Sequence, residues 1–182
     1  MCLVHTTGEA RVANMNKELQ KFRSKLDNFF GWVKVTELVE LDDIDVSEDP
    51  VRPELSVEWR KEYGRKIFGL KYKDEVEGII CIAYTNDIPE SVKELDLMSQ
   101  NAHYKGDANT AVAYTVWSRK RGAGKELIGK IGDMMEADNN ITTLVTLSPL
   151  TPMATHFHIR NGAKQIAISS TTQNFKYDLK KE

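Results

Sequence analysis

The sequence predicts a mixed α/β fold in which helices flank a curved, partly parallel sheet. Residues 110–179 run in the order strand–helix–strand–helix–strand–strand, which is typical of this class. Ahead of them, Lys66–Tyr72 and Val76–Tyr84 flank the short polar segment Lys73-Asp74-Glu75, and this arrangement predicts a β-hairpin. The second arm of the hairpin is apolar on both faces, which indicates a strand in the middle of a sheet.

The composition is that of one soluble domain with a substantial core. The chain has 182 residues, 41% of them hydrophobic, and its formal net charge of −2 argues against a dedicated nucleic-acid binder. No apolar run approaches the roughly 20 residues of a membrane span, and the first residues do not resemble a secretory leader. Cys2 and Cys81 form no disulfide framework. We therefore expect a cytoplasmic protein without nucleic-acid or membrane partners. The sequence leaves open whether the chain forms a homodimer.

The N-terminal third is expected to contribute a helix, a strand and an acidic loop. Residues 16–30 carry apolar side chains at helical spacing, namely Leu19, Phe22, Leu26 and Phe29. Residues 33–41 alternate weakly, as a strand would. Glu37–Asp49 contains seven acidic residues and no basic one, which predicts a solvated loop or, alternatively, an acidic partner-binding arm. We divide the chain into 1–56, packed on or extending the core, and a core domain over 57–182.

The later elements are bounded by capping and turn residues. Ser56 is placed to cap a short helix through Tyr63, and Asp87 is a candidate cap for a helix over 89–100. Cys81 lies among isoleucines and is expected to be inert core. The elements expected further on are a strand over 110–117, a helix around 127–135, a strand over 141–147, a helix over 152–161, and strands over 164–169 and 174–179.

The strongest chemical signal is the junction between a buried strand and a helix at Trp117-Ser118-Arg119-Lys120-Arg121-Gly122-Ala123-Gly124-Lys125. Glycines let a backbone approach a ligand closely, and the first amides of a helix have no internal partners. Together with the helix dipole and nearby bases, these features predict a cradle for a pyrophosphate. The P-loop and dinucleotide patterns do not fit its glycine spacing. The alternative is an ordinary glycine-rich turn.

Two motifs resemble the GNAT superfamily of acyl-CoA N-acyltransferases. Arg119-x-x-Gly122-x-Gly124 resembles its pyrophosphate loop, and Ala154-x-x-Phe157-His158-x-x-x-Gly162-Ala163 resembles its Ala-x-x-Phe-Tyr-x-x-x-Gly-Phe helix. The resemblance covers about residues 66–179. It implies a GNAT-like acyl-CoA-binding fold in which the strands over 110–117 and 141–147 splay apart, with pantetheine in the gap.

The same resemblance implies acetyl-CoA or another acyl-CoA as cosubstrate, bound without a metal. The CoA-binding residues that it implies are Val116, Trp117, Arg119, Lys120, Arg121, Gly122, Ala123, Gly124 and Lys125. From the residues alone, Trp117 can serve either packing or ligand contact.

Other features resemble one branch, the catalytic domain of malonyl-CoA decarboxylase. Thr85-Asn86-Asp87-Ile88, Leu147-Ser148-Pro149 and Phe157-His158-Ile159-Arg160-Asn161-Gly162-Ala163 are similar to its Thr-x-Asp-Ile, Leu-Ser-Pro and Phe-His-x-x-Asn-Gly-Ala segments. The resemblance implies that Ser148 and His158 are catalytic. Without it, Ser148 can equally be a strand-end cap and His158 a packed core residue.

Three functions follow, led by transfer of an acetyl or acyl group from CoA to an amine of a small molecule or protein. In that reaction His158 protonates the leaving thiolate and Ser148 orients the amine. The alternative is decarboxylation of malonyl-CoA to acetyl-CoA, in which Ser148 holds the carboxylate and His158 supplies a proton or steadies the enolate. The third is a non-catalytic CoA-binding module.

Overall fold

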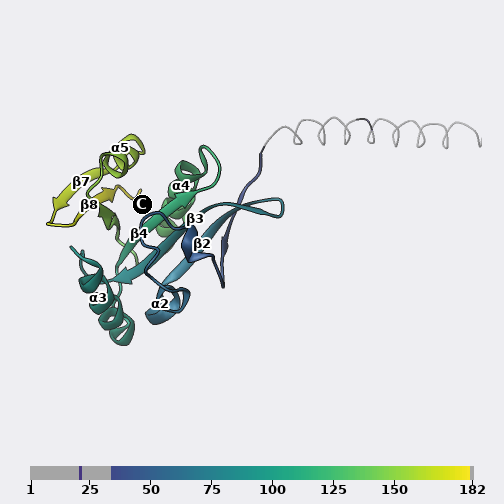
Figure 1. The fold of residues 1–182 in the computed structure, drawn as a ribbon. Helices are drawn as coiled ribbons and strands as arrows, with labels where there is room; N and C mark the ends of the chain where they lie inside the picture. Colours follow the sequence, from purple (N-terminus) through teal and green to yellow (C-terminus); the bar gives the residue numbers. More distant parts are fainter. Residues whose placement is uncertain (1–20, 22–33, 181–182) are drawn as a thin grey trace, which may run out of the picture. The chain divides into compact units, whose positions relative to one another are not determined.

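The computed structural model of the chain describes Lys21 and residues 34–180. The chain divides into two compact units, Met1–Val35 and Thr36–Glu182, and the sheet with its helices belongs to the second (Figure 1). The helix expected over 16–30 lies outside the described residues apart from Lys21, so it stays a prediction.

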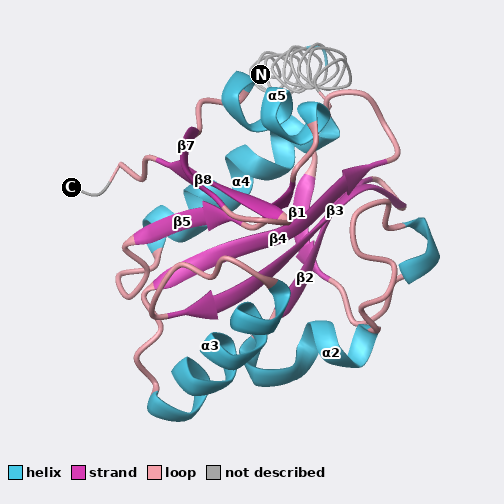
Figure 2. Ribbon diagram, turned by 60° about the vertical axis from the view of Figure 1, so that its left-hand side comes forward, coloured by secondary structure: helices cyan, strands magenta, loops and turns pink. Residues whose placement is uncertain are grey.

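An eight-stranded sheet forms the centre of the second unit, in the order β1-β2-β3-β4-β5-β8-β6, with β7 paired to β8 (Figures 1 and 2). Its strands are β1 (Glu37–Glu40), β2 (Lys66–Tyr72), β3 (Glu75–Thr85), β4 (Thr110–Ser118), β5 (Thr143–Thr146), β6 (Ser148–Pro149), β7 (Lys164–Ile168) and β8 (Thr172–Tyr177). Only β4 and β5 pair in parallel among the described strands. The mixed, partly parallel sheet and the β2–β3 hairpin are thus confirmed.

Helices cover both faces of this sheet. They are α2 (Val57–Lys61), α3 (Val92–Lys105), α4 (Ala123–Ala137) and α5 (Pro152–Arg160), with 3-10 turns at Val46–Glu48 and Glu62–Gly64. Figure 2 shows α2 and α3 on one side of the sheet and α4 on the other. No helix in the described part of the chain is long and apolar enough to cross a membrane.

The helix expected over 89–100 begins and ends later than the sequence suggested. It covers Val92–Lys105, because the side chain of Ser91 accepts a hydrogen bond from an amide of the first turn and Gly106 ends the helix at a φ of 67°. The expectation that Asp87 caps this helix is therefore wrong. Its carboxylate instead accepts a hydrogen bond from the amide of the next residue. Ser56 does cap α2, as expected.

Two hydrophobic clusters fill the two faces of the central strands. On the α4 face the buried residues include Phe68, Leu70, Ile80, Ile82, Leu127, Ile131 and Met135. On the α3 face they include Ile67, Ile79, Cys81, Leu95, Val112 and Tyr114. Neighbouring residues of β3 point to opposite clusters, as strand geometry requires. Cys81 is core, and burial raises the pKa of its thiol to about 11.

The acidic segment Glu37–Asp49 is largely solvated, as its charge suggested, because six of its seven acidic residues are exposed. It departs from a simple loop at its two ends. Glu37–Glu40 forms β1, which pairs with β2 at the sheet edge. At the other end of the segment, Asp49 is only 1% exposed. Its carboxylate lies 2.7 Å from Arg60 Nη2, and both side chains are fully buried. A buried cation that neutralises this carboxylate explains why charge alone gave the wrong expectation for Asp49.

Candidate active site

β4 and β5 separate midway along β4. Their parallel pairing ends at Ala113 opposite Thr146, after which the amide of Leu147 donates to the carbonyl of Ala113 at 3.0 Å. β4 then continues to Ser118, while the chain that follows β5 forms β6, which pairs with β8. At the same level, a bulge in the pairing with β3 leaves Tyr114 without a partner residue. A gap therefore opens beside the second half of β4.

A cavity of about 320 Å³ occupies this gap. Its lining comes from β4, β6, α5, the start of α4 and the loop before α2. The lining residues are Pro50, Val51, Ala113, Tyr114, Thr115, Val116, Trp117, Ser118, Gly124, Ser148, Pro149, Thr151, Met153, Ala154, Phe157 and His158. Among these described residues there is no Asp, Glu, Lys or Arg. The cavity wall is thus largely apolar, with hydroxyl groups and one imidazole as its polar side chains.

Ser148 and His158, the two predicted catalytic residues, meet in the wall of this cavity. Ser148 Oγ lies 2.9 Å from His158 Nε2, and His158 Nδ1 lies 2.9 Å from the hydroxyl of Tyr177 on β8. Ser148 Oγ also lies 3.0 Å from Thr146 Oγ1. One chain of hydrogen bonds thus joins Thr146 on β5, Ser148 on β6, His158 on α5 and Tyr177 on β8.

His158 is a neutral imidazole at physiological pH. It is 3% exposed, and its ring stacks on Phe175 with centroids 4.9 Å apart. This burial lowers its pKa to about 4. Burial also raises the pKa of Tyr177 well above its usual range, so that hydroxyl keeps its proton.

The hydrogen-bond chain runs consistently in one direction. With Tyr177 donating to Nδ1, the neutral ring carries its proton on Nε2 and donates it to Ser148 Oγ. Ser148 then donates its own hydrogen to Thr146 Oγ1, which also accepts from the amide of Phe175 at 3.2 Å. A rotation about the Cβ–Oγ bond of Ser148 moves its hydroxyl hydrogen away from Thr146 and directs it to a ligand instead.

The predicted phosphate cradle lies at the start of α4. Gly122 adopts a φ of 90° and precedes the helix without a side-chain cap. The amides of Gly124 and Lys125 belong to the first turn, where helix geometry provides no internal acceptor. A Cβ added to Gly124 would come within 3.2 Å of the Phe157 ring, so this glycine permits close packing of α4 against α5.

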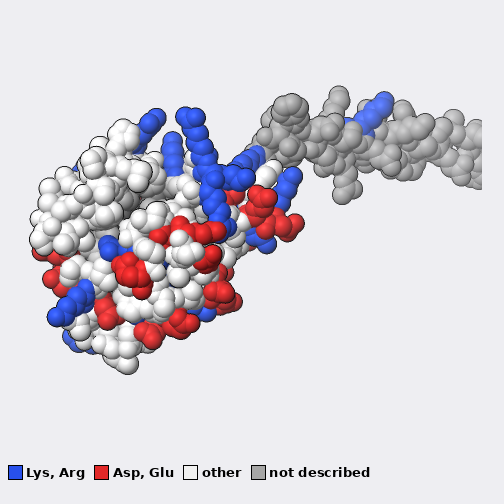
Figure 3. Space-filling view, in the orientation of Figure 1, with Lys and Arg blue, Asp and Glu red and all other residues white. Residues whose placement is uncertain are grey.

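The bases of this loop differ in how far they are already paired. Arg119 Nε donates to Glu48 Oε2 at 2.8 Å, and its Nη2 contacts the same oxygen. Lys120 Nζ lies 3.7 Å from Glu75 Oε2. Arg121, by contrast, has no ion pair within the part of the chain that the structure describes. Basic and acidic side chains accordingly lie side by side on this face of the molecule (Figure 3).

Only part of the predicted CoA-binding set shares the cavity with Ser148 and His158. Val116, Trp117 and Gly124 line it, whereas Arg119–Ala123 and Lys125 lie outside the lining. Trp117 packs in the α3-face core and also lines the cavity. Its packing role is thus observed, and its contact with a ligand stays a prediction.

The sequence did not reveal Tyr177, Thr146 or Arg52 as parts of this region. Tyr177 and Thr146 occupy ordinary strand positions, and only the pairing of β5 and β6 with β8 brings them to His158 and Ser148. Arg52 is the first basic residue after the acidic run, which is only a weak signal in the sequence.

Known structures share this fold, although no family model and no curated protein matches the sequence. The malonyl-CoA decarboxylase of Agrobacterium vitis matches with 21% identity over 74% of this chain and 39% of its own, at a TM-score of 0.52. That of Rhodopseudomonas palustris matches with 17% identity over 94% of this chain and 67% of its own, at a TM-score of 0.60. GphF, a GNAT-like decarboxylase in complex with isobutyryl-CoA, matches with 11% identity over 79% of this chain and 100% of its own, at a TM-score of 0.61.

An acetyltransferase of the GNAT family from Desulfovibrio desulfuricans and an N-acetyltransferase from Staphylococcus aureus match as well. The chain therefore has the GNAT-like fold that its motifs implied. Acyl-CoA acetyltransferases and decarboxylases both use this fold, and the likeness does not choose between their reactions.

Proposed function

We propose that this chain is an acyl-CoA-utilising enzyme that decarboxylates a thioester of the malonyl-CoA class. The observation that carries the proposal is the 2.9 Å contact between Ser148 Oγ and His158 Nε2 in the wall of the cavity beside β4. This pair stands where the two strands separate, within the GNAT-like fold.

The CoA part of the substrate follows the path that the fold offers. Pantetheine lies along the open edge of β4, and the diphosphate lies on the amides at the start of α4. Arg121 and Lys125, both without an ion pair among the described residues, add positive charge there. This path brings the thioester into the cavity beside Ser148.

In the reaction, the bond between the carboxylate carbon and the α-carbon breaks. Its electron pair moves to the thioester as an enolate, and CO₂ leaves. The Ser148 hydroxyl donates a hydrogen bond to the thioester oxygen, where negative charge develops. The apolar cavity wall disfavours the carboxylate relative to neutral CO₂.

The α-carbon then takes a proton from the Ser148 hydroxyl. Because a carbanion beside a thioester is a stronger base than an alkoxide, a neutral hydroxyl suffices as the acid. His158 Nε2–H returns a proton to Ser148 Oγ, and solvent restores the chain after the product leaves. The net reaction consumes one proton and yields acetyl-CoA and CO₂.

Acyl transfer to an amine ranks second. The GNAT acetyltransferases among the structural neighbours favour it. However, an ammonium substrate must lose a proton before it attacks, and no carboxylate lines the described cavity. With a pKa of about 4, His158 is a poor base for that step.

The test is incubation with malonyl-CoA without any amine. We expect acetyl-CoA and CO₂, with the rate reduced about 100-fold or more in Ser148→Ala and His158→Asn. His156→Asn changes an exposed histidine on the same helix and is the matched control, which should keep the rate.

Two results would contradict the proposal. Release of CoA from acetyl-CoA only with an amine present would establish transfer. If CoA raises the melting temperature but neither assay gives product, the chain is a binding module.

A further inference from the structure

The strand β7 has an open edge. Among the described strands it pairs only with β8, so the backbone groups along its outer edge have no strand partner there. Its isoleucines are exposed as well, Ile166 by 43% and Ile168 by 68%. Lys164 and a bulge between Gln165 and Ala167 protect the first half of the strand. The second half is an exposed apolar edge of the kind that natural proteins rarely leave uncovered.

The apolar surface continues from β7 towards α5. Ile168 lies directly opposite Gln173 on β8, so the two side chains point to the same side of the sheet. Gln173 lines a groove of about 610 Å³ beside α5, and the exposed side chains of Leu150 and Ile159 line the same groove. We call Leu150, Ile159, Ile166 and Ile168 together the β7 face. These four are half of the eight large apolar side chains that are exposed in the described part of the chain.

This part of the chain carries almost no charge. Within residues 141–175 the only Asp, Glu, Lys or Arg residues are Arg160 and Lys164, whereas 29% of the whole chain is charged. Lys164 Nζ already lies 2.7 Å from Asp178 Oδ2, and Arg160 stands in the last turn of α5, where the helix end favours a cation. Figure 3 shows a largely uncharged lobe where Figure 1 places β7 and α5. The β7 face is therefore complementary to a surface that brings no charge.

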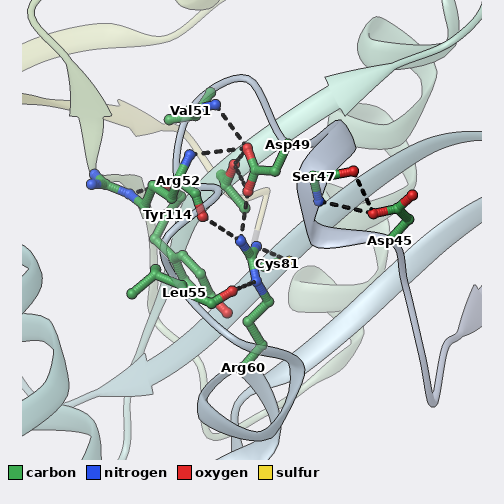
Figure 4. A network of polar contacts seen from close by, with 10 residues as sticks. Asp45, Ser47, Asp49, Val51, Arg52, Leu55, Arg60, Cys81 and Tyr114 are labelled. Atoms are coloured by element: carbon green, nitrogen blue, oxygen red, sulfur yellow. Dashed lines mark hydrogen bonds and ion pairs between the residues drawn. The ribbon is translucent and has the colours of Figure 1, made fainter.

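A charged partner surface would be a poor match for this face. Where the molecule buries a charge, a counter-ion from another element neutralises it, as Arg60 does for Asp49 (Figure 4). Opposite the isoleucines of β7 a charge would be buried without such a partner. A second copy of the same face brings apolar side chains and an open strand edge, and both are what β7 lacks.

We propose that two copies of this chain associate through the β7 face, with their β7 strands antiparallel about a twofold axis near Ile168. In such an isologous contact the same patch serves on both copies, and each open edge supplies hydrogen-bond partners to the other. The two Lys164 side chains lie at opposite ends of the paired strands, so like charges do not meet. This association goes beyond the proposed reaction and does not depend on it.

Analytical ultracentrifugation of the full chain over a range of concentrations tests the association. We expect a dimer. Ile168→Lys places two like charges near the axis and should raise the dissociation constant of the dimer about tenfold or more. Leu97→Lys is the matched control, because Leu97 is equally an exposed apolar residue but lies on α3, and it should leave the dimer intact.

Hydrogen exchange gives a second measure that needs no substitution. Peptides that cover β7 should exchange more slowly at high than at low protein concentration, because dimerisation pairs their amides. Peptides that cover β1, at the opposite edge of the sheet, should not change. A monomer at every concentration, or a dimer that Ile168→Lys leaves intact, would overturn the proposal, as would exchange in β7 that is independent of concentration.

Discussion

The imidazole of His158 is held on three sides. Phe175 stacks on its ring, and the hydroxyls of Ser148 and Tyr177 contact its two nitrogens. A ring held this way keeps one tautomer and one orientation. Burial favours its neutral form, so it acts as a fixed hydrogen-bond donor toward Ser148 rather than as a base. These properties suit a reaction that begins with bond cleavage in the substrate instead of proton removal.

The lowered pKa of His158 predicts how stability depends on pH. The unfolded chain binds a proton at His158 below about 6.5, whereas the folded chain does so only below about 4. The unfolded state therefore binds more protons in this window, and stability falls as the pH drops from about 6.5 to about 4. The contribution is on the order of 3 kcal/mol at the lower end.

Urea unfolding at several pH values measures this dependence. The His158→Asn variant should lose less stability across the window than the unmodified chain, because carboxylates contribute equally to both. Identical losses would show that His158 is not buried in its neutral form.

At the scale of elements, the acidic segment is tied to the phosphate loop and to the sheet core. Glu48 binds Arg119 at the mouth of the loop, while Asp49, one residue later, binds Arg60 in the interior. The first contact is partly exposed and the second is fully buried. We therefore expect the Glu48–Arg119 contact to affect the binding of an anion and the Asp49–Arg60 contact to support the fold.

Replacement of Glu48 tests the first contact. Glu48→Gln removes a carboxylate that competes with phosphate for Arg119, so we expect CoA to bind about threefold more tightly at low salt. The gain should shrink at high salt, where surface charges are screened. Isothermal titration checks this, with Glu58→Gln, a change at an exposed residue of α2, as the control. Unchanged CoA affinity would mean that Arg119 does not face the phosphates.

Replacement of Asp49 tests the second contact. Asp49→Ala leaves Arg60 buried without its anion and frees the amides of the loop before α2. Breaking one side of a buried pair typically costs about 3–5 kcal/mol, and we expect a loss of that size in urea unfolding. Asp42→Ala removes the carboxylate of an exposed pair with Lys61 and should cost less than about 1 kcal/mol. Equal losses would contradict the assignment.

At the scale of the whole molecule, sequence reasoning succeeded where local patterns decide the outcome. The β2–β3 hairpin and the junction of β4 with α4 follow from apolar periodicity and turn residues within short windows. Ser148 and His158 are 10 residues apart, and motif resemblance found both. Arg52 and Leu147 are 95 residues apart, so their contact exists only once the sheet has formed. The buried Asp49 was missed for the same reason, since its partner cation is supplied by another element.

The most direct test of the central claim is to incubate the chain with malonyl-CoA in D₂O and follow the thioesters by mass spectrometry. Decarboxylation at this site predicts acetyl-CoA that carries one deuterium in its methyl group, formed without any amine and lost in Ser148→Ala. Malonyl-CoA that stays intact, under conditions where CoA raises the melting temperature of the same sample, would contradict it.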